Sequence, residues 1–111
     1  MKIIIRWITL LSVLATLVGT ASASLDGSIA GTVVDQGEQP LPGVVVTIVN
    51  STSGYSATKV TDIDGAFTAG NLQPATYTLT LTLPGFALLK KEVQVLAGRT
   101  VHPTYVMTAS P

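Results

Sequence analysis

The side chains that most often carry catalysis are scarce in this sequence. Its 111 residues include one histidine, His102, and no cysteine. A zinc enzyme needs several nitrogen or carboxylate ligands at fixed spacing, and a catalytic serine or cysteine needs a histidine beside it. Neither a His-x-x-Glu pair nor a Gly-x-Ser-x-Gly motif occurs. We therefore predict that the chain is not an enzyme, has no catalytic residues and binds no cofactor, and that His102 is a surface side chain rather than a ligand.

Two aspartates, Asp62 and Asp64, stand in the sequence Asp-Ile-Asp-Gly, which looks like the start of a calcium loop. The further ligands of such a loop, including its distal glutamate, are missing. Aspartate also bonds backbone N–H groups two residues on, and Gly65 accepts a left-handed conformation. We interpret this segment as a hairpin turn and predict no metal site, with Asp62 and Asp64 kept as a weak calcium candidate.

A few aromatic residues are candidates for contact with a ligand such as a glycan. Aromatic rings present large apolar faces on which sugars can stack. The only tryptophan lies in the N-terminal segment, and Phe67 and Tyr77 fall on the predicted core faces of strands. The candidates are therefore Tyr55 and Phe86, with Tyr105 as a third choice.

The first 23 residues have the three parts of a secretory signal peptide. Lys2 and Arg6 form a basic start, an apolar run covers residues 7–18, and residues 21–23 (ASA) form a small-residue cleavage site. A retained membrane anchor is the alternative, but the run is shorter than the roughly 20 residues that a spanning helix needs. We predict cleavage after Ala23, a mature domain over 24–111 without a membrane span, and a secreted, periplasmic or cell-envelope location.

The charge of the mature segment argues against nucleic acid as a partner. The whole chain has six bases and six acids, and Lys2 and Arg6 lie in the predicted signal peptide. Four bases then face six acids, for a net charge of −2, and no basic patch of the kind that binds nucleic acid is present.

The mature sequence is typical of an all-β domain, because short runs rich in Val, Ile, Thr and Tyr alternate with turn residues. The clearest strand is 76–83, in which Tyr and Leu alternate strictly with Thr, so that one face is buried and the other is wet. Residues 29–34 form a first strand. Residues 44–49 are apolar on both faces, as in a central strand or one with a contact surface on its second face.

Further strands are expected at 55–61 and around Phe67. The run 87–96 carries a lysine on its apolar face, which predicts a bulge or an edge position. Pro103 within the last strand, 100–108, predicts an edge there too. About seven strands at this spacing predict a single antiparallel β-sandwich.

The order and spacing of the turn motifs carry a family resemblance. The motifs are 31–35 (GTVVD), 40–44 (PLPGV), 61–67 (TDIDGAF), 71–72 (NL), 74 (P), 77–79 (YTL) and 84–86 (PGF). Together they resemble the carboxypeptidase regulatory-like domain, a seven-stranded transthyretin-like (prealbumin-like) sandwich often grouped with carbohydrate-binding-like folds. Ala75 departs from the glycine usual there, so a strained or differently shaped turn is expected.

The resemblance implies an accessory module of the kind found beside zinc carboxypeptidase domains, before TonB-dependent outer-membrane receptors, or in strings on bacterial surface proteins. Our first hypothesis is a non-catalytic module for protein interaction or structural spacing in the cell envelope, where an edge strand such as 100–108 could pair with a partner. The second is a carbohydrate-binding module that uses Tyr55 and Phe86. The third is a truncated N-terminal domain of a TonB-dependent receptor. The partner, an envelope protein or a glycan, is not identified by the sequence.

Overall fold

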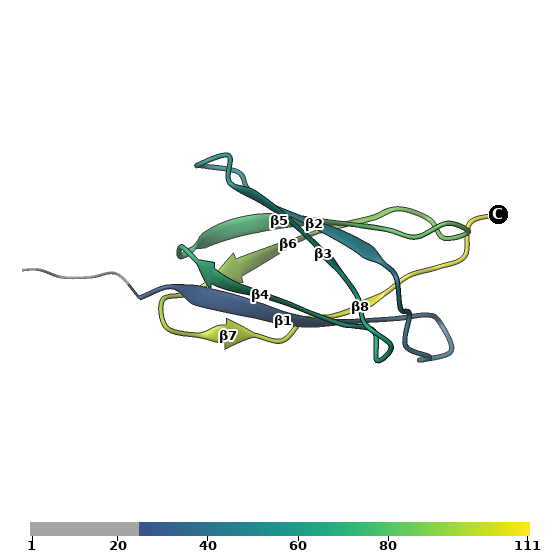
Figure 1. Cartoon of the computed structure of the whole chain (residues 1–111). Coiled ribbons are helices and arrows are strands. Elements are labelled where there is room, and N and C mark those ends of the chain that lie inside the picture. Colours follow the sequence, from purple (N-terminus) through teal and green to yellow (C-terminus); the bar gives the residue numbers. More distant parts are fainter. Residues whose placement is uncertain (1–24) are drawn as a thin grey trace, which may run out of the picture.

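Eight strands form two sheets that pack face to face (Figure 1). The computed structural model describes residues 25–111, and the predicted signal peptide lies outside this range. The strands are β1 (Gly27–Val34), β2 (Val45–Asn50), β3 (Ser56–Val60), β4 (Ala66–Leu72), β5 (Ala75–Thr82), β6 (Leu89–Val95), β7 (Thr100–Val101) and β8 (Thr104–Val106). Within the described range no helix is long and apolar enough to cross a membrane.

The predicted all-β sandwich is confirmed, with two differences in detail. One sheet has the order β4-β1-β7, with β8 also paired to β1, and the other has the order β3-β2-β5-β6. The predicted last strand is divided in two, because Pro103 lacks the N–H that a continuous ladder needs; its carbonyl still accepts a hydrogen bond from the Thr32 N–H (3.0 Å). In addition, β7 and β8 run parallel to β1, whereas the other pairings are antiparallel.

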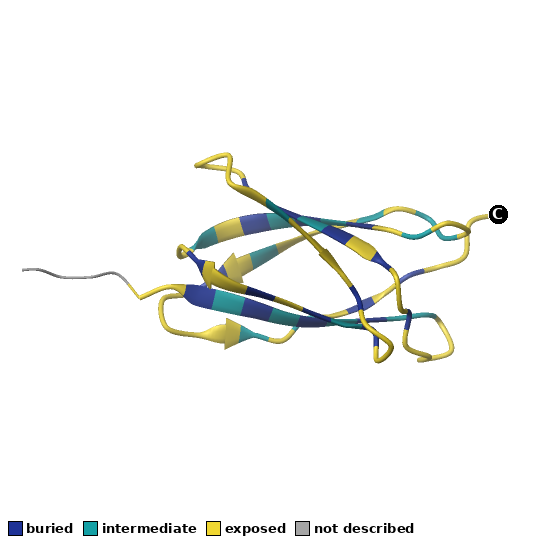
Figure 2. Cartoon of the chain, in the orientation of Figure 1, coloured by how far each residue is buried: buried dark blue, intermediate teal, exposed yellow. Residues whose placement is uncertain are grey.

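The core lies between the sheets, where the period-two patterns predicted it (Figure 2). Along β5 the burial alternates as expected, with Tyr77, Leu79 and Leu81 buried and the threonines more exposed. The inner face of 44–49 is fully buried, but Val45 on the outer face is 37% exposed. A sandwich of two layers leaves this outer face to solvent, so the apolar residues there are not core.

Each sheet edge carries a feature that discourages pairing with another strand. In the β3-β2-β5-β6 sheet, Lys59 on edge strand β3 is paired with buried Val46, and Lys91 on edge strand β6 is paired with buried Leu79. Both lysines thus occupy core-side positions at an edge, one of the known protections against edge-to-edge aggregation. The predicted edge position of Lys91 is confirmed, and the unbroken β5–β6 register shows no bulge there.

The other sheet protects its edges by irregularity. Its register shifts between Gly27 and Ile29, opposite the stretch of β4 that contains Asn71, and Asn71 has a positive φ of 55°. Pro103 interrupts the opposite edge, as predicted. Ala75 has no positive φ, so the expected strain is absent at that residue. The positive φ in this region lies at Asn71 instead, and the Tyr77 hydroxyl donates to the Gln73 carbonyl (2.7 Å) across the turn.

A buried threonine holds two loops together at the end of the sandwich where β1 ends. The Thr61 hydroxyl donates to the Leu41 carbonyl (2.6 Å) and accepts from the Val44 N–H (2.9 Å). Leu41 belongs to the β1–β2 loop and Thr61 begins the β3–β4 loop. Because buried polar groups must be satisfied, this clamp fixes the two loops side by side.

Candidate functional site

The β3–β4 loop is the turn that its sequence predicts. Asp62 Oδ1 accepts from the N–H groups of Asp64 (2.9 Å) and Ala66 (3.0 Å), and Gly65 has a positive φ of 71°. Residues 25–111 contain no group of three His, Cys, Asp or Glu side chains placed to hold a metal ion. The turn accounts for one Asp62 oxygen; the absence of a metal site stays a prediction, with Asp62 and Asp64 as the weak calcium candidate.

The β1–β2 loop repeats this turn bond for bond, which sequence reasoning missed. Asp35 Oδ1 accepts from the N–H groups of Gly37 (2.8 Å) and Gln39 (2.9 Å). The left-handed position is taken by Glu38, with a φ of 63°. The sequence signal for this turn was Asp35-Gln36-Gly37. The similarity to the Asp62 turn was concealed because Glu38 occupies the left-handed position, which favours glycine.

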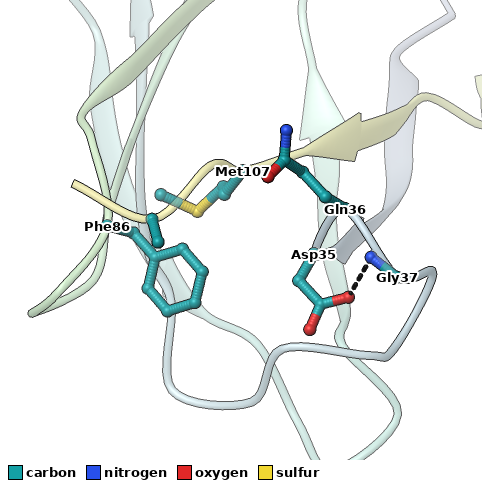
Figure 3. A pocket seen from close by; sticks show the side chains of 6 residues that line it. Asp35, Gln36, Gly37, Phe86 and Met107 are labelled. Atoms are coloured by element: carbon teal, nitrogen blue, oxygen red, sulfur yellow. Dashed lines mark hydrogen bonds between the residues drawn. The ribbon is translucent and has the colours of Figure 1, made fainter. Parts of the chain in front are cut away.

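An open cavity of about 230 Å³ lies beside the Asp35 loop and not beside the Asp62 loop. Figure 3 shows the ring of Phe86 and the sulfur of Met107 on one side, and the side chains of Asp35 and Gln36 on the other. Ala109 completes the apolar wall and Gly37 the loop side. The cavity therefore has one apolar wall and one polar wall that carries a carboxylate.

Three segments far apart in the sequence form this cavity, and backbone hydrogen bonds hold them. The Met107 N–H donates to the Val34 carbonyl (2.9 Å), which fixes the chain after β8 next to the end of β1. The Ala87 N–H donates to the Thr108 carbonyl (2.8 Å), and Phe86 forms an isolated bridge with Ala109. Backbone hydrogen bonds to the neighbouring segments thus anchor the apolar wall.

The aromatic candidates do not come together. The β2–β5 register pairs Asn50 with Tyr77 at one end of the sheet and Val45 with Thr82 at the other. Tyr55, half exposed, follows the first end, and Phe86, partly buried, follows the second. The two rings therefore lie at opposite ends of the sheet and cannot form one platform.

Tyr105 and His102 have different surroundings. Tyr105 is buried in the core, and this burial raises the pKa of its hydroxyl above the ordinary value. Tyr105 is therefore not a platform residue. His102 is exposed next to Pro103, which confirms the predicted surface position.

A second cavity, of about 420 Å³, lies at the opposite end of the sandwich between the starts of β1 and β7 and the end of β4. Its lining is Asp26, Gly27, Ser28, Thr68, Gly70, Asn71, Gly98, Arg99 and Thr100. Ser28 and Thr100 bond each other through their hydroxyls (2.7 Å). This hollow has no aromatic or thioether wall, and most of its residues are exposed.

Comparisons with known proteins place the fold. The sequence model of the carboxypeptidase regulatory-like domain matches residues 28–108. No curated protein matches the sequence.

Solved structures of bacterial proteins, two pilus proteins among them, are similar to the chain. The Bacillus anthracis TIE protein has a TM-score of 0.67 at 20% identity, over 77% of this chain and 17% of that one. The group B streptococcus pilus 2b backbone protein has 0.65 at 21%, over 77% and 42%. The minor pilin of Streptococcus agalactiae has 0.66 at 20%, over 79% and 46%. At these identities the likeness is one of fold, and the chain spans less than half of each of these proteins.

Proposed function

The chain belongs to the carboxypeptidase regulatory-like domain family. From this premise we propose that it is a non-catalytic spacer module of the bacterial cell envelope, which separates the segments attached to its two ends. One observation carries the proposal: the parallel pairing of β1 with β7 and β8. Since the first and last strands run in the same direction, the described chain begins at one end of the sandwich and finishes at the other (Figure 1).

The length of β1 sets the scale of this separation. Its eight residues, Gly27–Val34, span about 23 Å at roughly 3.3 Å per residue. The Ser110 N–H donates to the Gly85 carbonyl (3.0 Å), which ties the C-terminal segment to the β5–β6 loop at the far end. Modules with ends placed in this way extend a chain linearly, as strings of surface domains require.

The similar folds in two pilus proteins support an envelope location for this chain as well. The protected sheet edges favour spacing, or contact through the ends, over strand addition at 100–108. The same linear geometry suits a domain that precedes a TonB-dependent receptor; this alternative stays a prediction that a reading frame continuing past Pro111 would decide.

Two measurements test the proposal. The chain has no cysteine, so spin labels attached at Leu25→Cys and Ser110→Cys report the end-to-end distance directly. We expect one narrow distribution at or above about 23 Å; a short or broad one would remove the observation that carries the proposal. An epitope placed after Pro111 should fractionate with the envelope of the producing bacterium, and recovery in the cytoplasm would refute the location.

A further inference from the structure

The cavity between Phe86 and Asp35 has the chemistry of a site for an organic cation. We propose that it receives the side chain of a lysine from a partner protein, with the ammonium group at Asp35 and the methylene stem along the apolar wall. The proposed function enters only as the source of that partner. The chemistry of the cavity stands without it.

The polar wall supplies the charge. Both hydrogen bonds that the described residues give to the Asp35 carboxylate end on Oδ1. In Figure 3 the other oxygen has no hydrogen bond to the residues drawn and points down in the view, with the ring of Phe86 across the cavity from the Asp35 side chain. Hydrogen bonds between an ammonium group and a carboxylate are roughly twice as strong as neutral ones. A second acceptor, the Gln36 amide oxygen, belongs to the same wall.

The apolar wall suits a cation with an aliphatic stem. The face of an aromatic ring attracts an ammonium group, and a lysine stem buries its methylenes along apolar surface while the charged head stays polar. Phe86 supplies such a ring, and Met107, which is almost fully buried, supplies a polarisable thioether at the base. None of the six lining residues is itself a cation that would neutralise Asp35.

A sugar fits this arrangement less well. Hydroxyl groups surround a sugar ring and need polar partners on several sides. Here the polar side chains, Asp35 and Gln36, come from a single loop, and Phe86, Met107 and Ala109 face them. A ligand that is polar at one tip and apolar along its length matches both walls.

The test is a titration of the ¹⁵N-labelled full chain with Nα-acetyl-lysine methylamide, followed by the amide signals of Gly37 and Gln39, which bond Asp35 directly. The corresponding norleucine compound lacks the ammonium group and is the control probe, and N-acetylglucosamine tests the glycan alternative. We expect saturable shifts with the lysine probe alone, weakened by 0.5 M salt because surface charge interactions are screened.

Two substitutions localise the site. Asp35→Asn keeps the oxygen that the turn needs and removes the charge, and Phe86→Leu removes the ring; each should weaken binding about fivefold. Asp62→Asn is the matched control, because the same change falls in the same kind of turn without the cavity. Should Phe86→Leu fail to fold, Asp35→Asn and the salt dependence decide.

Several outcomes would overturn the proposal. Equal binding of the norleucine probe would make the cavity merely apolar, and saturable binding of N-acetylglucosamine alone would make it a glycan site. Equal weakening by Asp62→Asn, or no shift with any probe, would refute it outright. None of these outcomes changes the end-to-end distance or the cellular location, so the proposed function would be judged separately.

Discussion

Two loops at one end of the sandwich have the same backbone hydrogen bonds and different surroundings. In each, an aspartate oxygen accepts from the N–H groups two and four residues on. In each, the aspartate N–H donates to the carbonyl of the fifth residue of the turn, Gln39 or Ala66. The aspartate carbonyl accepts from the N–H of the fourth residue, Glu38 or Gly65. The two turns therefore share one hydrogen-bond pattern, begun by Asp35 or Asp62, although only the aspartate is common to the two sequences.

The fourth residue shows where the loops differ. Gly65 is buried, and a β-carbon added to it would collide with the Val33 carbonyl oxygen. Glu38 has nearly the same φ but is exposed, so its side chain extends into solvent. Glycine at position 65 is required by the close approach of β1 as well as by the positive φ. At position 38 only the positive φ disfavours a residue with a β-carbon.

The surroundings also decide which loop lines a cavity. Phe86, Met107 and Ala109 lie beside the Asp35 loop and provide it with an apolar wall. The Asp62 loop packs its glycine against β1 and lines neither of the two cavities described above. The same turn thus packs against β1 in the Asp62 loop and forms one wall of a candidate site in the Asp35 loop.

The largest effect should come from Gly65→Ala. The left-handed conformation costs a residue with a β-carbon about 1–2 kcal/mol, and displacing the backbone of β1 adds a further penalty of about 1–3 kcal/mol. We expect the free energy of unfolding, measured by urea denaturation, to fall by about 3 kcal/mol.

Glu38→Ala is the control for this change, because position 38 already holds a β-carbon at positive φ. It should alter the free energy of unfolding by less than about 0.5 kcal/mol. A loss at position 65 of only about 1–2 kcal/mol, the left-handed cost alone, would show that the approach of β1 adds nothing to the requirement for glycine.

The contrast between the loops also shows which structural features can be predicted from the sequence. The strands and their inner faces followed from alternation, as at Tyr77, Leu79 and Leu81, because period two is a local property of the chain. The Asp62 turn followed from its own residues for the same reason. The edge strands were recognisable from Lys91 and Pro103, which are costly in the middle of a sheet.

The candidate site did not follow from the sequence, because its walls come from three segments. Phe86 was chosen as an exposed aromatic together with Tyr55, yet its neighbours in the fold are Asp35 and Met107. Their proximity depends on β8 lying parallel to β1, a long-range pairing that no local pattern encodes. The hydrogen bond from the Met107 N–H to the Val34 carbonyl likewise depends on this parallel pairing.

A smaller effect is expected from truncating the Asp62 turn. Asp62→Ala leaves the Asp64 and Ala66 N–H groups without their acceptor, and at an exposed loop this should cost about 1–2 kcal/mol of unfolding free energy. Asp62→Asn retains an acceptor oxygen and should cost less than about 0.5 kcal/mol. Thermal melts with and without calcium complete the test: equal melting temperatures agree with a purely structural turn, and a rise abolished by Asp62→Asn would establish the calcium site.

Apart from the control substitutions, the smallest effect is expected from Glu38→Gly, and it sharpens the comparison most. This change gives the Asp35 loop the residue found in its twin and relieves the left-handed cost of about 1–2 kcal/mol. Glycine also gives the unfolded chain more freedom, which offsets about 0.4–1 kcal/mol. We expect a net gain of about 0.5 kcal/mol in urea denaturation, with lysine-probe binding unchanged because Glu38 does not line the cavity. A loss of stability would mean that Glu38 makes a favourable interaction that offsets its strained φ, and the two loops would then differ in their own energetics as well as in their neighbours.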